Sequence, residues 1–300
     1  MTKLNVAVIG LGSMGYGMAA SVARAGHTTW GFDLDEEAMA RFRAREGGQE
    51  GALPDIAADL DVVVIVVLNA AQTESVLFGE AGIVAQMKPG ATVLACATVP
   101  PSFARDMEAR CNAVGLFYVD APISGGSLKA HEGSLTIMAS ARAEAFAAAR
   151  PVLDATAETV FELGDCAGGG SAMKAVNQLL AGVHIAAMGE AITFGITQGV
   201  TPAKFVEVIS RCAGTSWMLE NRAPHVVEGD YTPRSSINIW PKDLGIVLDI
   251  AREAKFSAPI TAAALQQYMT AAATGLGQED DAAIAKVYAR NAGVKLPGQA

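Results

Sequence analysis

The chain has 300 residues, which suits two domains of the usual ~150 residues each. Hydrophobic residues make up 51% of it and charged residues 18%, a balance that excludes a disordered or fibrous protein and predicts large buried cores. The formal net charge is −9. A general nucleic-acid binder needs a basic face, so we expect no nucleic-acid partner.

Neither the cysteines nor the histidines have the spacing of a metal or redox site, and we expect no metal. The four cysteines contain no CxxC pair and are interpreted as buried, small apolar residues in a reducing cytosol. Met1-Thr2-Lys3 leads directly into a strand pattern, which predicts no signal peptide. The longest aliphatic run, 62–68, is too short to span a bilayer. These features predict a soluble, cytoplasmic protein.

The first half of the chain alternates short apolar runs with helical stretches. Helices are predicted over 13–25 and 35–45, the second with acidic residues in its first turn and arginines near its end, as the helix dipole favours. Strands are predicted over 4–9, 28–32, 62–68, 91–96, 117–120 and 135–139. Apolar runs without alternation are typical of a parallel sheet covered on both faces. This half therefore predicts an α/β domain with right-handed crossovers.

The pattern changes near residue 164, after which no strand is predicted. A long, Ala-rich helix is expected over 171–198, and its apolar composition predicts burial between neighbours. Further helices are predicted at about 202–212, 216–228, 241–254, 259–274 and 280–291. The predicted domains are thus an α/β domain over 1–164 and an all-helical domain over 165–300.

A glycine-rich motif, Gly10-Leu11-Gly12-Ser13-Met14-Gly15, follows the first predicted strand and opens a helix. In this context GxGxxG is the fingerprint of a dinucleotide-binding turn, whose helix N-terminus attracts the cofactor pyrophosphate. Asp33 ends the second strand at about 20 residues from the motif, where a carboxylate binds the adenosine ribose hydroxyls. It would also repel a 2′-phosphate, and positions 34–37 hold no lysine or arginine. We therefore predict NAD rather than NADP.

Two further motifs carry polar groups suited to a small acid. Ser124-Gly125-Gly126 follows a strand, and its backbone N–H groups and hydroxyl could hold a carboxylate, although the same tripeptide is common in ordinary turns. Lys174, Asn177 and Gln178 share one face of the long helix. A lysine facing inward on an apolar helix is suited to proton transfer, because burial lowers a lysine pKa; a lysine reaching from the first turn to solvent is the equally weighted alternative.

The sequence resembles the β-hydroxyacid dehydrogenases, the family of 3-hydroxyisobutyrate dehydrogenase. The likeness covers nearly the whole chain and rests on four stretches in the right order: 8–15, 120–126, 168–178 and Lys242-Asp243-Leu244-Gly245. The resemblance implies a Rossmann-type domain followed by an all-α domain of the 6-phosphogluconate dehydrogenase C-terminal type. It also implies that a long interdomain helix joins them and that the active site lies in the cleft between them.

The resemblance also assigns roles to single residues. It implies that Lys174 is the catalytic acid and base and that Ser124, Gly125 and Gly126 bind the substrate. Leu68, Asn69 and Thr98 would line the cofactor, and Lys242 would lie near the nicotinamide with Asp243 supporting it. The family usually has asparagine four residues after the lysine, where this chain has Gln178 next to Asn177. We expect either side chain to bind the substrate.

The predicted function is oxidation of a small hydroxy acid by NAD. Stretches 69–72, 178–187, 216–222 and 230–235 resemble the branch of the family that converts L-threonate to 2-oxo-tetronate. The alternatives are a 3-hydroxyisobutyrate dehydrogenase, a reductase of tartronate or succinic semialdehyde or glyoxylate, and, more remotely, a non-catalytic cofactor-binding module. We expect no membrane partner, and the excess of apolar helix predicts a homodimer or homotetramer.

Overall fold

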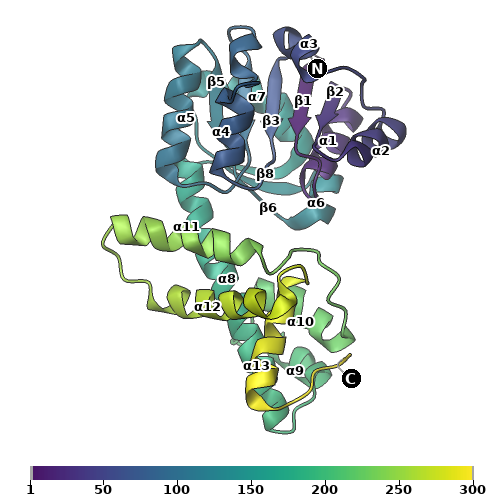
Figure 1. Cartoon of the computed structure of the whole chain (residues 1–300), viewed down its shortest axis with the longest axis vertical. Helices are drawn as coiled ribbons and strands as arrows, with labels where there is room; N and C mark the ends of the chain where they lie inside the picture. The colour runs from purple at the N-terminus through teal and green to yellow at the C-terminus, as the bar shows by residue number, and fades with distance from the viewer. Residues whose placement is uncertain (1–2, 299–300) are drawn as a thin grey trace. The chain divides into compact units, whose positions relative to one another are not determined.

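The computed structural model describes residues 3–298 in two compact units, the first ending at Lys174 and the second beginning at Ala175 (Figure 1). The first unit is an α/β domain. Its strands are β1 (Asn5–Ile9), β2 (Thr28–Phe32), β3 (Val62–Ile65), β4 (Thr92–Ala95), β5 (Phe117–Asp120), β6 (Ile123–Ser124), β7 (Leu135–Ala139) and β8 (Ala157–Glu162). Its helices are α1 (Gly15–Arg24), α2 (Glu36–Glu46), α3 (Leu53–Ile56), α4 (Ala70–Phe78), α5 (Pro101–Ala113), α6 (Gly126–Glu132) and α7 (Ala143–Thr156), with short 3₁₀ turns η1 (Ala57–Asp59) and η2 (Val84–Gln86).

Five strands form a parallel sheet in the order β2-β1-β3-β4-β5. The chain moves outward from β1 to β2, then returns to the other side of β1 to form β3. In such doubly wound sheets ligands bind at the carboxyl ends of the strands, at this point of reversal. The predicted Rossmann-type fold is confirmed, and the expected strands over 28–32 and 117–120 have the same limits in the structure.

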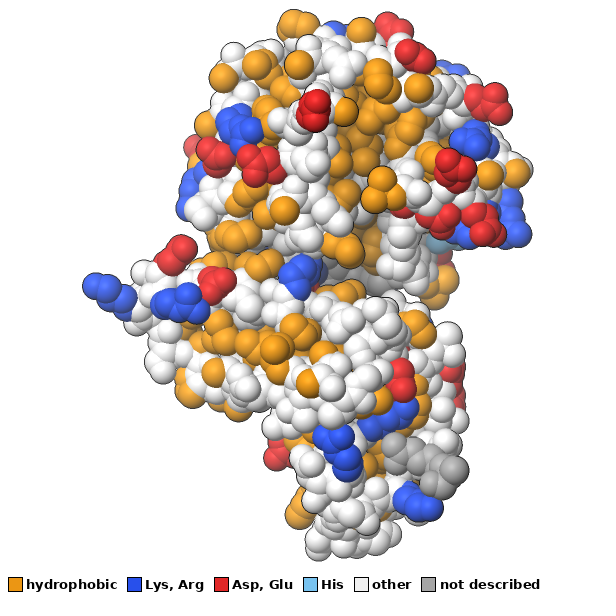
Figure 2. Space-filling view, in the orientation of Figure 1, with side chains coloured by type: hydrophobic (Ala, Val, Ile, Leu, Met, Phe, Trp, Pro, Cys, Tyr) orange, Lys and Arg blue, Asp and Glu red, His pale blue; other side chains and the backbone are white. Residues whose placement is uncertain are grey.

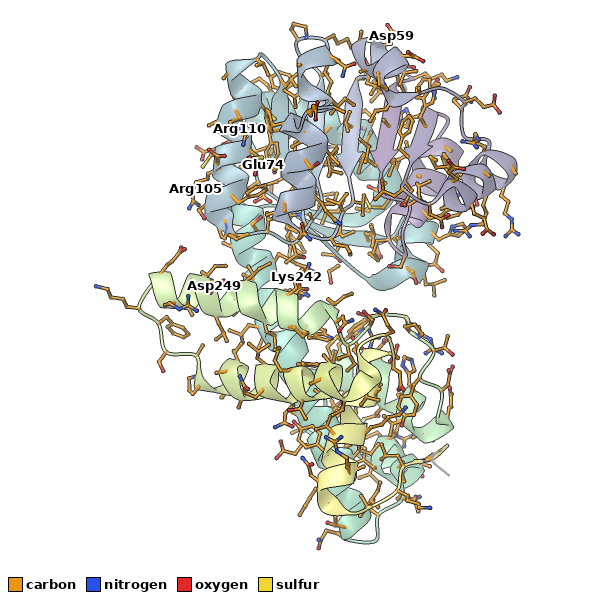
Figure 3. The ribbon with its side chains drawn as sticks, in the orientation of Figure 1. Asp59, Glu74, Arg105, Arg110, Lys242 and Asp249 are labelled. Atoms are coloured by element: carbon orange, nitrogen blue, oxygen red, sulfur yellow. The ribbon has the colours of Figure 1, made fainter. Side chains whose placement is uncertain are left out.

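Both faces of this sheet are covered, which explains why its strands are apolar without alternation. Val6, Val8 and Val64 point toward α1, α2 and α7 in one core. Ala7 and Val63 point toward α4 and α5 in the other. On the outer side of that second layer, Arg110 of α5 forms an ion pair with Glu74 of α4 at 2.6 Å (Figure 3).

A second, three-stranded sheet follows in the order β6-β7-β8. Strand β7 pairs antiparallel with β6 and parallel with β8, so the predicted strand 135–139 lies outside the parallel sheet. Asp120 and Ser140 form a bridge that joins β5 to the end of β7. Strand β8 is largely exposed, lies at a sheet edge and follows α7 without a turn, so it lacks the continuous apolar run from which the other strands were predicted.

The second unit is helical apart from one isolated bridge in the residues that the structure describes. Helix α8 (Gly169–Thr197) runs from the first unit into the second, which confirms the predicted long linking helix. The rest consists of α9 (Pro202–Ile209), α10 (Trp217–Glu228), α11 (Ile239–Glu253), α12 (Pro259–Ala271), a π-helical turn η3 (Ala272–Leu276), a 3₁₀ turn η4 (Asp281–Ile284) and α13 (Ala285–Ala292).

Helix α8 is long and apolar enough to cross a bilayer by length and composition alone. Such composition is also typical of the core helix of a soluble protein. Here Ile185, Met188 and Ile192 are fully or almost fully buried in the core of the second unit. These positions of α8 therefore belong to the core of the second unit, whereas Met173, Val176, Leu180 and Phe194 on the same helix are exposed, so the predicted burial of the whole helix is only partly met.

Candidate active site

The glycine-rich turn at the end of β1 has the geometry that a dinucleotide needs. Gly10 has φ +97°, and a Cβ there would lie 2.3 Å from the carbonyl oxygen of Val66, so only glycine fits. A Cβ on Gly12 would meet nothing within 4 Å, which leaves open space beside the turn. Helix α1 begins here without a side-chain cap at Met14, so its first N–H groups are available to an anion. These residues fit a bound pyrophosphate.

Asp33 ties the turn to the following helix. Its Oδ2 accepts a hydrogen bond from Leu11 N at 2.5 Å and its Oδ1 accepts one from Asp35 N at 3.0 Å. The carboxylate is thereby fixed at the end of β2, in the position predicted for contact with the ribose.

The turn and Asp33 line a single cavity of about 460 Å³. The cavity also reaches groups that the sequence alone did not indicate: Arg41 on α2, and Ser127 and His131 on α6. The complete lining is Leu11, Gly12, Ser13, Tyr16, Gly17, Asp33, Asp35, Ala38, Arg41, Ser127 and His131. Its residues come from α1, α2, α6 and the ends of β1 and β2, all within the first unit.

Three more predicted cofactor residues follow the neighbouring strands. Leu68 and Asn69 come after β3, and Thr98 comes after β4, so all three lie toward the carboxyl edge of the parallel sheet. Asn69 caps α4 by accepting a hydrogen bond from Gln72 N at 2.9 Å. Its side chain therefore has a local structural role beside the predicted cofactor role.

The structure brings Lys174 to the Ser-Gly-Gly loop. The Lys174 ammonium donates a hydrogen bond to the carbonyl oxygen of Ile123 at 2.9 Å, and Ile123 directly precedes Ser124. Lys174 is only 9% exposed, so it does not reach out to solvent. Gly125 has φ +138°, and a Cβ there would lie 3.0 Å from the Lys129 side chain. This geometry favours glycine in the loop that the resemblance assigns to the substrate.

Asp120, whose role sequence reasoning missed, anchors this region. Its Oδ2 accepts hydrogen bonds from Gly168 N at 2.9 Å and Ser171 N at 2.8 Å, and its Oδ1 accepts one from Ser171 Oγ at 2.6 Å. Ser140 Oγ donates to the same carboxylate. Burial raises the pKa of Asp120, and these hydrogen bonds offset part of that rise. The carboxylate thus fixes the start of α8, one turn before Lys174, to the end of β5.

A second cluster lies in the second unit. Asn177 Nδ2 donates a hydrogen bond to Gln178 Oε1 at 3.0 Å, and Gln178 Nε2 donates one to Asp243 Oδ2 at 2.5 Å. Lys242 forms an ion pair with Asp243 Oδ1 at 2.8 Å. Figure 3 shows Lys242 on α11. These four predicted residues are therefore brought together, with Gln178 and Asp243 both buried.

The cysteines differ sharply in environment. Cys96 and Cys111 are buried, and burial raises the pKa of each thiol, for Cys111 to about 12. Cys166 and Cys212 are exposed, so the prediction that all four cysteines are buried is wrong for these two. Within residues 3–298, no three side chains of histidine, cysteine, aspartate or glutamate form a group that could hold a metal ion.

Comparisons with known proteins agree over both units. A family described as the NAD binding domain of 6-phosphogluconate dehydrogenase matches residues 5–164, and one described as NAD-binding of NADP-dependent 3-hydroxyisobutyrate dehydrogenase matches residues 168–288. The chain is 49% identical to an L-threonate dehydrogenase of Cupriavidus necator, over 99% of each protein. It is 42% identical to an L-threonate dehydrogenase of Escherichia coli K12, over 99% of this chain and 98% of that protein.

A solved structure supports the same family assignment. The crystal structure of 3-hydroxyisobutyrate dehydrogenase from Salmonella typhimurium superposes with a TM-score of 0.89 and 43% identity, over 95% of this chain and all of that one. Sequence and fold thus agree with these relatives along almost the whole length of the chain. The chain belongs to the 3-hydroxyisobutyrate dehydrogenase-related family of β-hydroxyacid dehydrogenases, and it is an NAD-binding oxidoreductase.

Proposed function

We propose that the protein oxidises L-threonate to 2-oxo-tetronate with NAD⁺. The observation that carries this proposal is the full-length identity of 42–49% to several L-threonate dehydrogenases. The site supports it, because a buried lysine lies beside a loop suited to a carboxylate. A 2-hydroxy acid carries its carboxylate next to the reacting carbon, so both groups can be bound close together.

In the proposed mechanism the first unit binds and deprotonates the substrate. The Ser124-Gly125-Gly126 loop binds the carboxylate through its hydroxyl and backbone N–H groups. Lys174, neutral in the oxidative direction, accepts the proton of the C2 hydroxyl on Nζ and becomes an ammonium. Bound NAD⁺ supplies the acceptor for the hydride that leaves C2. In the reductive direction the Lys174 ammonium returns its proton to the carbonyl oxygen.

The cluster in the second unit has supporting roles in this proposal. The side-chain amide of Gln178 is engaged at its oxygen by Asn177 and at its nitrogen by Asp243, so we assign substrate contact to Asn177 and a positioning role to Gln178. Asp243 holds Lys242, which we assign to the nicotinamide end of the cofactor. Leu68, Asn69 and Thr98 keep their proposed places along the cofactor.

We propose NAD⁺ as the preferred cofactor because Asp33 presents a fixed carboxylate to the adenosine ribose. The carboxylate accepts hydrogen bonds from free ribose hydroxyls and repels a 2′-phosphate. We assign cofactor binding to residues 1–164. We propose that residues 165–300 complete the substrate site and form the contact between subunits. We place the protein in the cytoplasm.

A second candidate is 3-hydroxyisobutyrate oxidation. It is favoured by the solved structure of that name at 43% identity. The same loop and lysine would serve, but the reacting hydroxyl would be on C3.

The test is NAD⁺ reduction, followed at 340 nm, with L-threonate, D-threonate, 3-hydroxyisobutyrate, D-glycerate and 4-hydroxybutyrate. We expect the highest kcat/KM with L-threonate and a low rate with its enantiomer. A preference for 3-hydroxyisobutyrate would favour the second candidate. Absence of turnover with every acid, in a protein that binds NAD⁺, would contradict both.

A further inference from the structure

The cavity lined by Asp33 also contains a cation that binding to the ribose hydroxyls does not require. Arg41 lies on α2 and lines the same cavity as Asp33 and Gly12. Gly12 is expected at the pyrophosphate and Asp33 at the ribose, so a cation in the same cavity is available to a group attached to that ribose. Arg41 is therefore in the region that a 2′-substituent would enter.

Arg41 is held in place by aromatic packing. Its guanidinium carbon lies 4.9 Å from the centroid of the Tyr16 ring, and Tyr16 packs edge-on against the buried Phe42. Among residues 3–298, Arg41 makes no ion pair with a carboxylate. A guanidinium fixed on a ring and left without an anionic partner is well suited to a phosphate.

The same cavity lining supplies further polar groups from α6. Ser127 and His131 come from α6, which packs closely on α1: a Cβ on Gly17 would lie 2.5 Å from His131 N. The hydroxyl and the imidazole can each donate a hydrogen bond to a phosphate oxygen. The cavity lining thus combines these donors and the Arg41 guanidinium with the fixed carboxylate of Asp33.

We propose that Arg41, with Ser127 and His131, forms a 2′-phosphate subsite that is silenced by the charge of Asp33. Cofactor selectivity then depends on the Asp33 carboxylate opposing the Arg41 guanidinium, in a cavity that Asp35 also lines. This inference builds on the proposed NAD-dependent function, and it names Arg41 as a second determinant of cofactor choice beside Asp33.

The test measures binding without catalysis, by titration calorimetry with adenosine 2′,5′-bisphosphate and with 5′-AMP. The readout is the ratio of the two Kd values, which isolates the contribution of the 2′-phosphate to binding. We expect the wild-type protein to favour 5′-AMP. In Asp33→Ser the ratio should shift toward the bisphosphate by at least tenfold, because the repelling charge is gone.

The decisive comparison adds a second substitution. Asp33→Ser/Arg41→Ala should lose most of that gain, whereas Asp33→Ser/Arg43→Ala should keep it, because Arg43 lies on α2 outside the cavity lining. Equal ratios in the two double variants would overturn the proposal. So would a ratio that stays at the wild-type value in Asp33→Ser and also in Asp33→Asn, which keeps an acceptor for Leu11 N.

NAD⁺ binding to the wild-type protein distinguishes a failure of the proposed function from a failure of the 2′-phosphate subsite. If NAD⁺ does not bind, the proposed function itself fails. If NAD⁺ binds and the Arg41 dependence is missing, only the 2′-phosphate subsite fails.

Discussion

Lys174 is the residue on which the proposed chemistry depends. Its ammonium is buried and hydrogen-bonded to Ile123 O next to the carboxylate loop, so removing it should affect proton transfer before cofactor binding. We expect Lys174→Ala to lower kcat by ~10²–10⁴-fold, the range typical of general acid–base catalysis. The Kd of NAD⁺, measured by fluorescence titration, should change little. Near-normal turnover would contradict the role.

Asp120 should matter for stability, because its carboxylate accepts buried N–H groups from the start of α8. Asp120→Ala leaves Gly168 N and Ser171 N without that acceptor, at a cost of about 3 kcal/mol in the free energy of unfolding. Asp120→Asn keeps an acceptor oxygen and removes a charge that burial disfavours, so it should cost less. Calorimetric Tm values test the order, with the exposed Asp106→Asn as control. An equal loss in both Asp120 variants would contradict this account.

For single residues, the sequence indicated which positions belong to the motifs, but it did not indicate which distant residues they contact. Gly10, Asp33 and Lys174 stand in recognisable local patterns. The hydrogen bonds of Asp120 to Ser171, and the shared cavity of Asp33 and Arg41, join residues whose contact depends on how helices pack. No local spacing encodes such contacts.

A buried ionic cluster joins three elements of the second unit, α10, η4 and α11. Arg222 pairs with Asp281 at 2.5 Å, and Trp240 Nε1 donates to Asp281 Oδ2 at 3.1 Å. His225 Nδ1 lies 2.9 Å from Asp280 Oδ1. Trp240 stacks on Tyr268 and stands two residues before Lys242. The cluster thus fixes the beginning of the helix that carries Lys242 and Asp243.

The acid stability of this unit should depend on Asp280. Burial alone would raise the pKa of Asp280, but hydrogen bonds from His225, Arg234 N and Ala282 N outweigh it and place the pKa below its ordinary value. A lowered carboxyl pKa stabilises the fold above the unfolded value, about 3.9, and this contribution is lost as the pH falls through the folded value.

We therefore expect Asp280→Asn to have a lower Tm than the wild-type protein at pH 7. The difference in Tm between the two proteins should become smaller as the pH falls below about 4, where Asp280 of the wild-type protein also loses its charge. Melting curves between pH 7 and pH 3 test this, with Asp249→Asn as an exposed control on α11. A difference that stays constant over the whole range would exclude the charge of Asp280 as its cause.

Element prediction from sequence succeeded where a strand is buried on both faces or a helix has clear end signals. Strands β2 and β5 have their predicted limits, and α10 begins within one residue of its expected start, where Ser216 caps it. Strands β6 and β8 were missed, because β6 has only two residues and β8 is a largely exposed edge strand without a continuous apolar run. Only pairing with β7 makes them strands.

At the scale of the whole molecule, exposed apolar side chains follow one stripe of α8. Met173, Val176, Leu180 and Phe194 are 45–65% exposed and recur at helical spacing. Figure 2 shows further hydrophobic side chains on the visible face of α11 and α12. Such stripes are typical of subunit contacts, which supports the proposed homo-oligomer.

Phe194→Glu should therefore lower the molar mass measured by light scattering after size-exclusion chromatography, because a charge would be buried in the contact. Val114→Glu, at an exposed apolar position in the first unit, serves as control and should leave the mass unchanged. A wild-type monomer, or an unchanged mass in Phe194→Glu, would contradict a contact through α8.

The distribution of the thiols offers a way to measure changes in the distance between the two units. Cys166 belongs to the first unit and Cys212 to the second, both exposed, whereas Cys96 and Cys111 are buried with raised pKa values. A maleimide dye should label two positions per native chain, one on each unit, without any engineered cysteine. Energy transfer between a donor and an acceptor dye would then report how the distance between the units changes when NAD⁺ and L-threonate are added.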